Sequence, residues 1–242
     1  MQKKLLFILS ILLVTGLPAQ QGWWTWMHGT NTIGSAGSYG TKGVTAASNN
    51  PPALYETGEW TDLSGNFWIF GGLSSTAGSE HGALWKYDPV ANMWTWINGP
   101  NTVAVAGVYG TQGVPAPGNQ PGCRSWGMVT WVDNAGDLWL FGGQGYDATG
   151  ANGNLSDLWK YTIASNQWTW MNGPNTKNQS AVWGTQGVAA ATNLPASRYE
   201  SAATWTDNTG KLWMFGGLTY NPSFGNTNDL WNYDPSTNMW TW

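Results

Sequence analysis

Few residues of this chain have side chains suited to acid–base or metal chemistry, and they are scattered. The chain has 242 residues with two histidines, His28 and His81, and one cysteine, Cys123. Two histidines offer little for a Ser-His-Asp arrangement, and no Gly-x-Ser-x-Gly motif occurs. The glutamates are too dispersed for sequence to pair them as glycosidase carboxylates. We predict no catalytic residue and no metal ligand, and keep Glu200 as a candidate binding residue.

Two arginines are candidates for holding an anionic group. Arg124 and Arg198 occupy equivalent positions in two repeats, and Ala53 occupies that position in the preceding one. A guanidinium can hold a carboxylate through two parallel hydrogen bonds. Alternatively, each arginine orders a loop by donating to backbone carbonyls. The sequence leaves both open.

Aromatic residues in the long connections form a second candidate group. Tyr39, Tyr109 and Trp183 each precede a Gly-Thr-x-Gly-Val segment, and Trp126 follows the first arginine by two residues. One hypothesis is a set of exposed rings that stack on a glycan. The other is that the recurring three pin each connection to the neighbouring sheet, and their regular recurrence favours this.

All these residues lie on a repeated sequence unit, and each marker of the unit recurs after 70 to 74 residues. Internal repeats are the sequence signature of architectures such as solenoids and propellers. Phe-Gly-Gly begins at Phe70, Phe141 and Phe215, and Leu-Trp-(Lys/Asn)-Tyr begins at Leu84, Leu158 and Leu230. All but Trp23, Trp126 and Trp183 of the 20 tryptophans occupy repeat positions, which predicts that most are core residues.

Each unit predicts four short antiparallel strands. In the second unit these are SWGMVTWVD, DLWLFGG, DLWKYT and QWTWM, in which aromatic and β-branched residues alternate with small or polar ones. Short Asp- and Gly-containing turns at 62–66, 133–137 and 207–211 join the first two strands. The prediction is an all-β fold of radially arranged four-stranded sheets.

The repeat resembles the kelch repeat of β-propellers. The resemblance rests on Ile69-Phe70-Gly71-Gly72 with Tyr87 and Trp94, and on the same pattern in the next two units. It covers essentially all of residues 20–242, although a kelch unit has about 50 residues and these units are longer. The excess lies between the fourth strand of one unit and the first of the next, as in secreted bacterial kelch repeats described as galactose-oxidase-like.

Counting units predicts an incomplete ring. Blades are expected at about 54–97, 124–171 and 198–242, and an orphan fourth strand at 23–27. Propellers typically have four to eight blades. Either the sequence is part of a longer chain, or two chains complete each other through open blade edges, because bare edges invite pairing.

The resemblance to galactose oxidase implies a copper site, which this chain does not match. That family uses two histidines and two tyrosines, one of them cross-linked to a cysteine. His28 lies beside the orphan strand, and no tyrosine neighbours Cys123 in the family manner. Copper is therefore expected only if a sugar-acting enzyme is the correct interpretation, and no cofactor is expected otherwise.

Residues 1–19 predict a signal peptide, with Lys3 and Lys4 followed by an apolar run from Leu5 to Gly16. We therefore expect a protein that is secreted or on the cell surface. The formal net charge of −4 argues against a nucleic-acid partner, and no membrane span is expected.

The function expected from these patterns is a non-catalytic binding or surface-interaction module for a glycan or a protein. The ligand should lie on the face of the variable connections 73–83, 144–157 and 218–229, since binding loops vary on a rigid scaffold. The alternative is a fragment of a secreted galactose-oxidase-like or other sugar-acting enzyme.

Overall fold

The computed structural model describes residues 22–74, 78–200, 202–220 and 223–242, and its regular elements are all β-strands. The predicted signal peptide lies outside the described residues. Within the described ranges, no helix long and apolar enough to cross a membrane occurs. The all-β prediction is confirmed.

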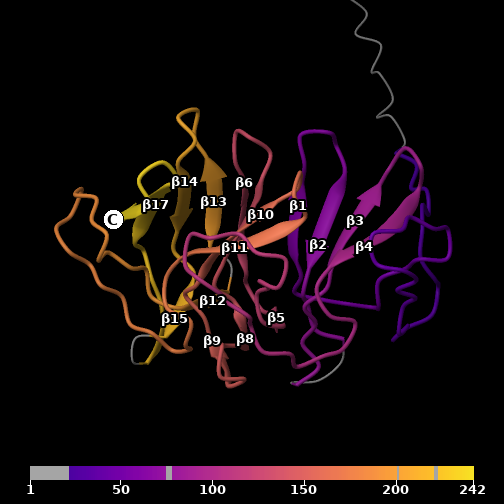
Figure 1. The fold of residues 1–242 in the computed structure, drawn as a ribbon, viewed down its shortest axis with the longest axis horizontal. Coiled ribbons are helices and arrows are strands. Elements are labelled where there is room, and N and C mark those ends of the chain that lie inside the picture. Colours follow the sequence, from indigo (N-terminus) through magenta and orange to yellow (C-terminus); the bar gives the residue numbers. More distant parts are fainter. Residues whose placement is uncertain (1–21, 75–77, 201, 221–222) are drawn as a thin grey trace, which may run out of the picture.

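Three four-stranded antiparallel sheets follow one another along the chain, one for each repeat (Figure 1). Sheet 1 contains β1 (Gly58–Thr61), β2 (Phe67–Phe70), β3 (Leu84–Asp88) and β4 (Met93–Asn98). Sheet 2 contains β6 (Val129–Val132), β7 (Leu138–Phe141), β10 (Leu158–Thr162) and β11 (Gln167–Asn172). Sheet 3 contains β13 (Ala203–Thr206), β14 (Leu212–Phe215), β17 (Leu230–Asp234) and β18 (Met239–Thr241). In each sheet the strands pair in chain order, and the innermost strands β1, β6 and β13 lie side by side, which fits a propeller-like arrangement.

Two three-stranded sheets each join the start of a predicted first strand to a hairpin in a connection that the sequence predicted to be irregular. One contains β5 (Arg124–Ser125), β8 (Gln144–Tyr146) and β9 (Asn152–Asn154), and the other contains β12 (Arg198–Glu200), β15 (Leu218–Tyr220) and β16 (Phe224–Asn226). The predicted strand SWGMVTWVD is therefore interrupted. Trp126 and Gly127 have φ of 53° and 66°, a left-handed backbone that breaks a strand.

The short turns between first and second strands form as predicted. In sheet 1, Asp62 accepts backbone hydrogen bonds from Ser64 and Asn66 through Oδ1, and its Oδ2 accepts the Trp68 indole N–H at 2.8 Å. The same indole bond recurs at 2.7 Å from Trp139 to Asp133 and from Trp213 to Asp207. Each aspartate thus fixes both its turn and a core tryptophan.

Tryptophan-rich clusters join consecutive sheets. The first cluster combines Trp60, Trp68 and Phe70 of sheet 1 with Trp159 and Trp168 of sheet 2, all at most 5% exposed. The second repeats this arrangement between sheets 2 and 3. Each buried aromatic ring contributes several kcal/mol at about 25 cal/mol per Å². These clusters hold the sheets together in a chain whose one cysteine is a free thiol.

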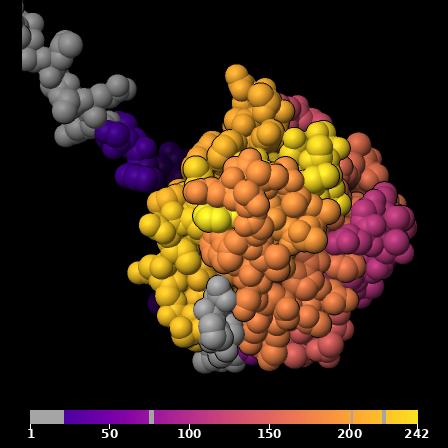
Figure 2. All heavy atoms as spheres, turned by 90° about the vertical axis from the view of Figure 1, so that its left-hand side faces the viewer, coloured from indigo at the N-terminus to yellow at the C-terminus, as the bar shows by residue number. Residues whose placement is uncertain are grey.

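The long insertions fold back onto the fourth strand of the sheet that follows them. In the first, Gly43 N–H donates to the Trp96 carbonyl at 2.7 Å, and Ala46 bridges to Trp94. Gly113 and Gly187 donate in the same way, at 2.7 Å, to the Trp170 and Trp242 carbonyls. Figure 2 shows the third insertion, in orange, spread over the C-terminal end of the molecule. The outer edges that we expected to be bare are therefore covered.

The expected orphan strand at 23–27 does not form. Residues 22–27 have no regular structure, and Trp23 and Trp24 are 90% and 101% exposed. A strand needs a neighbour for its backbone hydrogen bonds. Among the described residues no strand pairs with this segment, so the repeat sequence alone does not create a strand.

Candidate binding face

The start of each inner strand presents one residue at the same face of the molecule. Tyr55, Trp126 and Glu200 each lie three positions before β1, β6 and β13, respectively. Tyr55 also bridges to Leu73, in the connection between β2 and β3. Sequence analysis named Trp126 and Glu200 but missed Tyr55, which is equivalent to them in the repeat.

Trp126 is held in an unfavourable backbone conformation. Its φ of 53° is uncommon for a bulky residue, and its side chain is half-buried. The ring meets Tyr55 edge-on, with centroids 5.8 Å apart and an interplanar angle of 89°. Tyr55 is itself 44% exposed. Such strain persists where the surroundings impose it and is concentrated at functional sites.

Gly127 allows this tryptophan to approach Glu200. A Cβ on Gly127 would lie 2.3 Å from the Glu200 Cα, so only glycine fits between the two segments. The Glu200 side chain is exposed. Glu200 therefore lies in the segment that passes next to Gly127, the neighbour of Trp126, and the ion pairs among the described residues do not include it.

A second aromatic pair lies beside Glu200. Tyr199 meets Phe224 with ring centroids 5.3 Å apart, and Phe224 is 60% exposed. We call Tyr55, Trp126, Tyr199, Glu200 and Phe224 the aromatic–acidic face. Accessible rings stack on apolar faces of a ligand, and a carboxylate accepts hydrogen bonds from hydroxyl groups. This combination suits recognition of a polar ring such as a sugar.

The two candidate arginines lie inside the fold. Arg124 has no exposed surface and binds both carboxylate oxygens of Asp157, at 2.7 and 2.8 Å, and the Gly142 carbonyl. Arg198 is equally buried and pairs with Asp229. The hypothesis of a ligand carboxylate is corrected: the carboxylate belongs to the chain itself. The alternative of bonds to backbone carbonyls is confirmed alongside it.

Sheet 1 lacks both partners of this ion pair. Ala53 replaces the arginine, and Ala83 replaces the aspartate. The Trp85 indole N–H is consequently buried without a partner, whereas Trp159 donates to Asp157 at 2.7 Å. The joint presence or absence of arginine and aspartate across the three repeats was the sequence signal that would have revealed the pairing.

The recurring aromatic residues of the insertions pack against their sheets. Tyr109 is 5% exposed and donates its hydroxyl to Asp157 at 2.7 Å, which corrects the hypothesis that it is an exposed stacking residue. Burial raises its pKa, and the Asp157 charge adds to this. Tyr39 packs on Trp85, and Trp183 on Trp231, with centroids 4.9 and 5.3 Å apart. The pinning role is confirmed for all three.

The fold brings His81, Cys123 and Tyr39 together under the first insertion. The Tyr39 hydroxyl lies 3.4 Å from His81 Nδ1. Burial raises the pKa of the Cys123 thiol to about 11 and lowers that of His81, so both are neutral at pH 7. His28 packs instead on Tyr87. Within the described residues, no group of three or more His, Cys, Asp or Glu side chains is placed to hold a metal ion. The Tyr39–His81 contact involves one histidine, whereas the copper set implied by the resemblance needs two.

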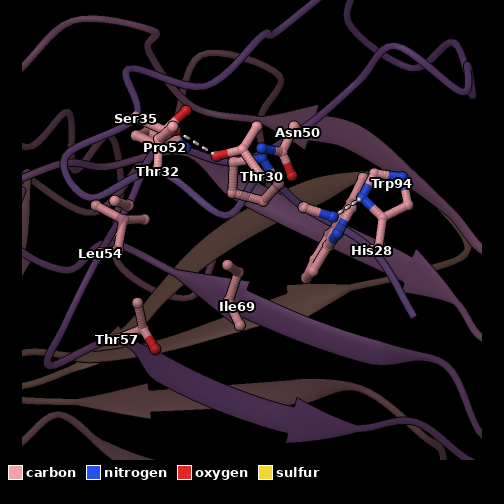
Figure 3. Close-up of a pocket in the computed structure, with 13 residues that line it drawn as sticks. His28, Thr30, Thr32, Ser35, Asn50, Pro52, Leu54, Thr57, Ile69 and Trp94 are labelled. Carbon is pink, nitrogen blue, oxygen red and sulfur yellow. Dashed lines mark hydrogen bonds between the residues drawn. The ribbon is translucent and has the colours of Figure 1, made fainter. Parts of the chain in front are cut away.

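Two hollows lie at the ends of the sheet stack. One, of about 320 Å³, lies between residues 28–35 and sheet 1 and is lined by Ile69, Leu54 and Trp94 (Figure 3). The other, of about 840 Å³, lies on sheet 3 beside Trp213 and Leu230. Both occupy sheet faces that no other sheet covers within the described part of the chain.

Comparisons with known proteins give limited information. The sequence matches no protein-family model, and no curated protein is similar to it. Among solved structures, one similar chain is described as the structure of YjhT, with 15% identity and a TM-score of 0.49. The match covers 78% of this chain and 52% of that one, so this chain spans about half the length of that protein.

Proposed function

We propose that this chain is a secreted kelch-type β-propeller segment that binds a glycan through the aromatic–acidic face, without catalysis. The sequence repeats and the predicted signal peptide support the family and the export. The observation that carries the binding role is Trp126. Its strained backbone holds a half-buried ring edge-on to Tyr55, and the backbone of the next residue, Gly127, adjoins that of Glu200.

A sugar fits this face better than a charged polymer does. The rings of Tyr55, Trp126 and Phe224 offer apolar surfaces, and Glu200 accepts hydrogen bonds from hydroxyl groups. The polar groups are few, which is typical of sites where a small number of them set ligand orientation. The ligand would stack on a ring and donate to the carboxylate.

Glycan-array screening followed by calorimetric titration of the full chain tests this proposal. Trp126→Ala should weaken binding of any glycan hit by at least about fivefold, since aromatic anchors typically contribute more than 1 kcal/mol. Glu200→Gln should weaken it less, because an amide still accepts one hydrogen bond. Trp24→Ala, at a fully exposed tryptophan of the N-terminal segment, is the matched control and should change nothing.

Two results would contradict the proposal. Equal loss of affinity in Trp24→Ala and Trp126→Ala would mean non-specific tryptophan binding. Peroxide release from sugars after copper loading would favour the sugar-oxidising alternative instead, and Trp126→Ala would then be assayed for turnover.

A further inference from the structure

Each of the three sheets has an equivalent apolar face for packing on the next sheet, and on sheet 3 this face is exposed. We call the forward face of a sheet the one that meets the next sheet, and the rear face the one that meets the preceding sheet. On the forward faces of sheets 1 and 2, the equivalent residues are at most 5% exposed; they are Trp60, Phe70, Leu84, Trp131, Phe141 and Leu158. On sheet 3, Trp205 and Phe215 are each 44% exposed and Leu230 is 42% exposed.

The two junctions within the chain are nearly identical in their aromatic contacts. Trp68 meets Tyr161 at 5.8 Å, and Trp139 meets Tyr233 at 5.5 Å. The next pair along the strands repeats as well, with Phe70 to Trp168 at 5.4 Å and Phe141 to Trp240 at 5.5 Å. The forward face thus presents a tryptophan and a phenylalanine, and the rear face receives them with a tyrosine and a tryptophan.

One hydrogen bond also recurs at both junctions. The Trp60 indole N–H donates to the Trp139 carbonyl at 3.0 Å, and the Trp131 N–H donates to the Trp213 carbonyl at 2.7 Å. Trp205 occupies the same position in sheet 3 and is stacked on Trp213, and the described part of the chain places no further sheet beside it. A buried indole N–H needs such an acceptor, so this bond fixes the register of the docked sheets.

The rear face of sheet 1 carries the matching residues and is incompletely covered. Tyr87, Trp94 and Ile69 are equivalent to Tyr161, Trp168 and Leu140 of sheet 2. Trp94 and Ile69 are half-buried and line the hollow of Figure 3. Their counterparts in sheets 2 and 3 are fully buried; they are Leu140, Trp168, Met214 and Trp240.

We propose that a second copy of this chain docks the forward face of its sheet 3 onto the rear face of sheet 1, and that a second identical junction closes the pair. Trp213 would meet Tyr87 of the other copy, Phe215 would meet Trp94, and the Trp205 N–H would bond the Trp68 carbonyl. The argument is continuity with the two junctions already present, because each residue type required is in place at both ends. Two copies supply six sheets, within the four to eight of known propellers.

In the proposed dimer, the second copy takes the place of residues 28–35, which now lie against the rear face of sheet 1. His28 now meets Tyr87 edge-on at 6.2 Å, and the adjoining residues enclose the hollow without filling it. Moving this segment exchanges that contact for an aromatic junction like those between the sheets. Exposed apolar patches rimmed by polar residues typically mark such protein interfaces.

The test is the oligomeric state of the full chain, measured by sedimentation over a dilution series. The wild type should dimerise. Phe215→Asp, on the forward face, and Ile69→Glu, on the rear face, should each weaken dimerisation by at least about a hundredfold, since both charges would lie in a buried junction. Val90→Asp, at a 96% exposed residue in the β3–β4 turn, should dimerise like the wild type. Near-UV circular dichroism checks that each variant is folded.

Mixing the two interface variants separates this arrangement from others. Phe215→Asp keeps an intact rear face and Ile69→Glu an intact forward face, so the mixture should form a heterodimer through one sound junction. A wild type that stays monomeric at every concentration overturns the proposal. So does a dimer that survives Ile69→Glu, or a folded mixture that stays monomeric. The glycan titration is a separate readout, because it uses Trp126→Ala and Glu200→Gln, and neither residue is among those that form the two junctions.

Discussion

At the residue scale, Arg124 and Arg198 form buried ion pairs within the chain and do not hold a ligand carboxylate. Arg124 and Asp157 have no exposed side-chain surface, and Tyr109 and Trp159 complete the hydrogen bonds of the carboxylate. Such a pair tolerates removal of both partners better than removal of one, because a single deletion leaves an uncompensated buried charge. Sheet 1, with alanine at both positions, folds on the same plan.

A double-mutant cycle on this pair should therefore be strongly non-additive. Asp157→Ala alone should lower the free energy of unfolding by about 3–5 kcal/mol, since Arg124 would remain buried and charged. Arg124→Ala together with Asp157→Ala should cost clearly less than the sum of the two single changes. Urea denaturation of the four proteins gives the coupling energy. Additive costs would show that the two side chains do not act as a pair.

At the scale of elements, each insertion covers a sheet edge with the help of one buried asparagine. Asn119 donates to the carbonyls of Val114 and Trp168, at 3.0 and 3.3 Å, which joins the insertion to β11. A Cβ on Gly110 would lie 2.3 Å from the Asn119 Oδ1, so the turn needs glycine there. Asn49 and Asn193 do the same for the other two sheets.

Asn119→Ala should loosen the contact between the second insertion and β11. The loss of two hydrogen bonds, one of them buried, should lower stability by about 1–3 kcal/mol, because the Val114 and Trp168 carbonyls each lose a donor. Hydrogen exchange should rise at Gly113, whose amide bonds the Trp170 carbonyl. Asn208→Ala, at an exposed turn residue, is the control and should leave both readouts unchanged. Unchanged exchange in Asn119→Ala would mean that Gly113 alone holds the insertion.

At the scale of the whole molecule, hydrogen-bonded aspartates in all three repeats link stability to pH. Burial raises the pKa of Asp62, but hydrogen bonds from Trp68 and Asn66 outweigh it, so the net pKa lies below its usual value. Burial likewise raises the pKa of Asp229, and Arg198 reverses the shift. Asp147, in the second repeat, also has a lowered pKa.

Acid should therefore destabilise all three repeats of the protein. A carboxyl whose folded pKa is lowered contributes stability above its unfolded pKa, about 3.9, and loses it as pH falls through the folded value. The urea midpoint should be level from pH 7 to about 5 and fall steeply below 4. Asp229→Asn should be less stable at pH 7 and show a shallower fall in acid. An unchanged acid slope in that variant would contradict the role of Asp229.

Much of the architecture was predictable because each repeat is a local pattern. Alternating aromatic residues, Asp-Gly turns and double glycines indicate strands and turns over short distances, and the three sheets formed where expected. The hairpins β8–β9 and β15–β16 were missed because their sequences vary and lack strong alternation. The broken strand at Trp126 was missed because nothing local requires a tryptophan to adopt a positive φ.

The sequence by itself determined the repeat, its strands and the abundance of core tryptophans, because these depend on residue periodicity and composition. Only the tertiary structure decided which polar residues are partners and which are free for a ligand. Arg124 and Asp157 are 33 residues apart, and Trp126 and Glu200 belong to different repeats. Their relations depend on how sheets pack and where glycine lets two backbones approach, and no short-range pattern encodes that geometry.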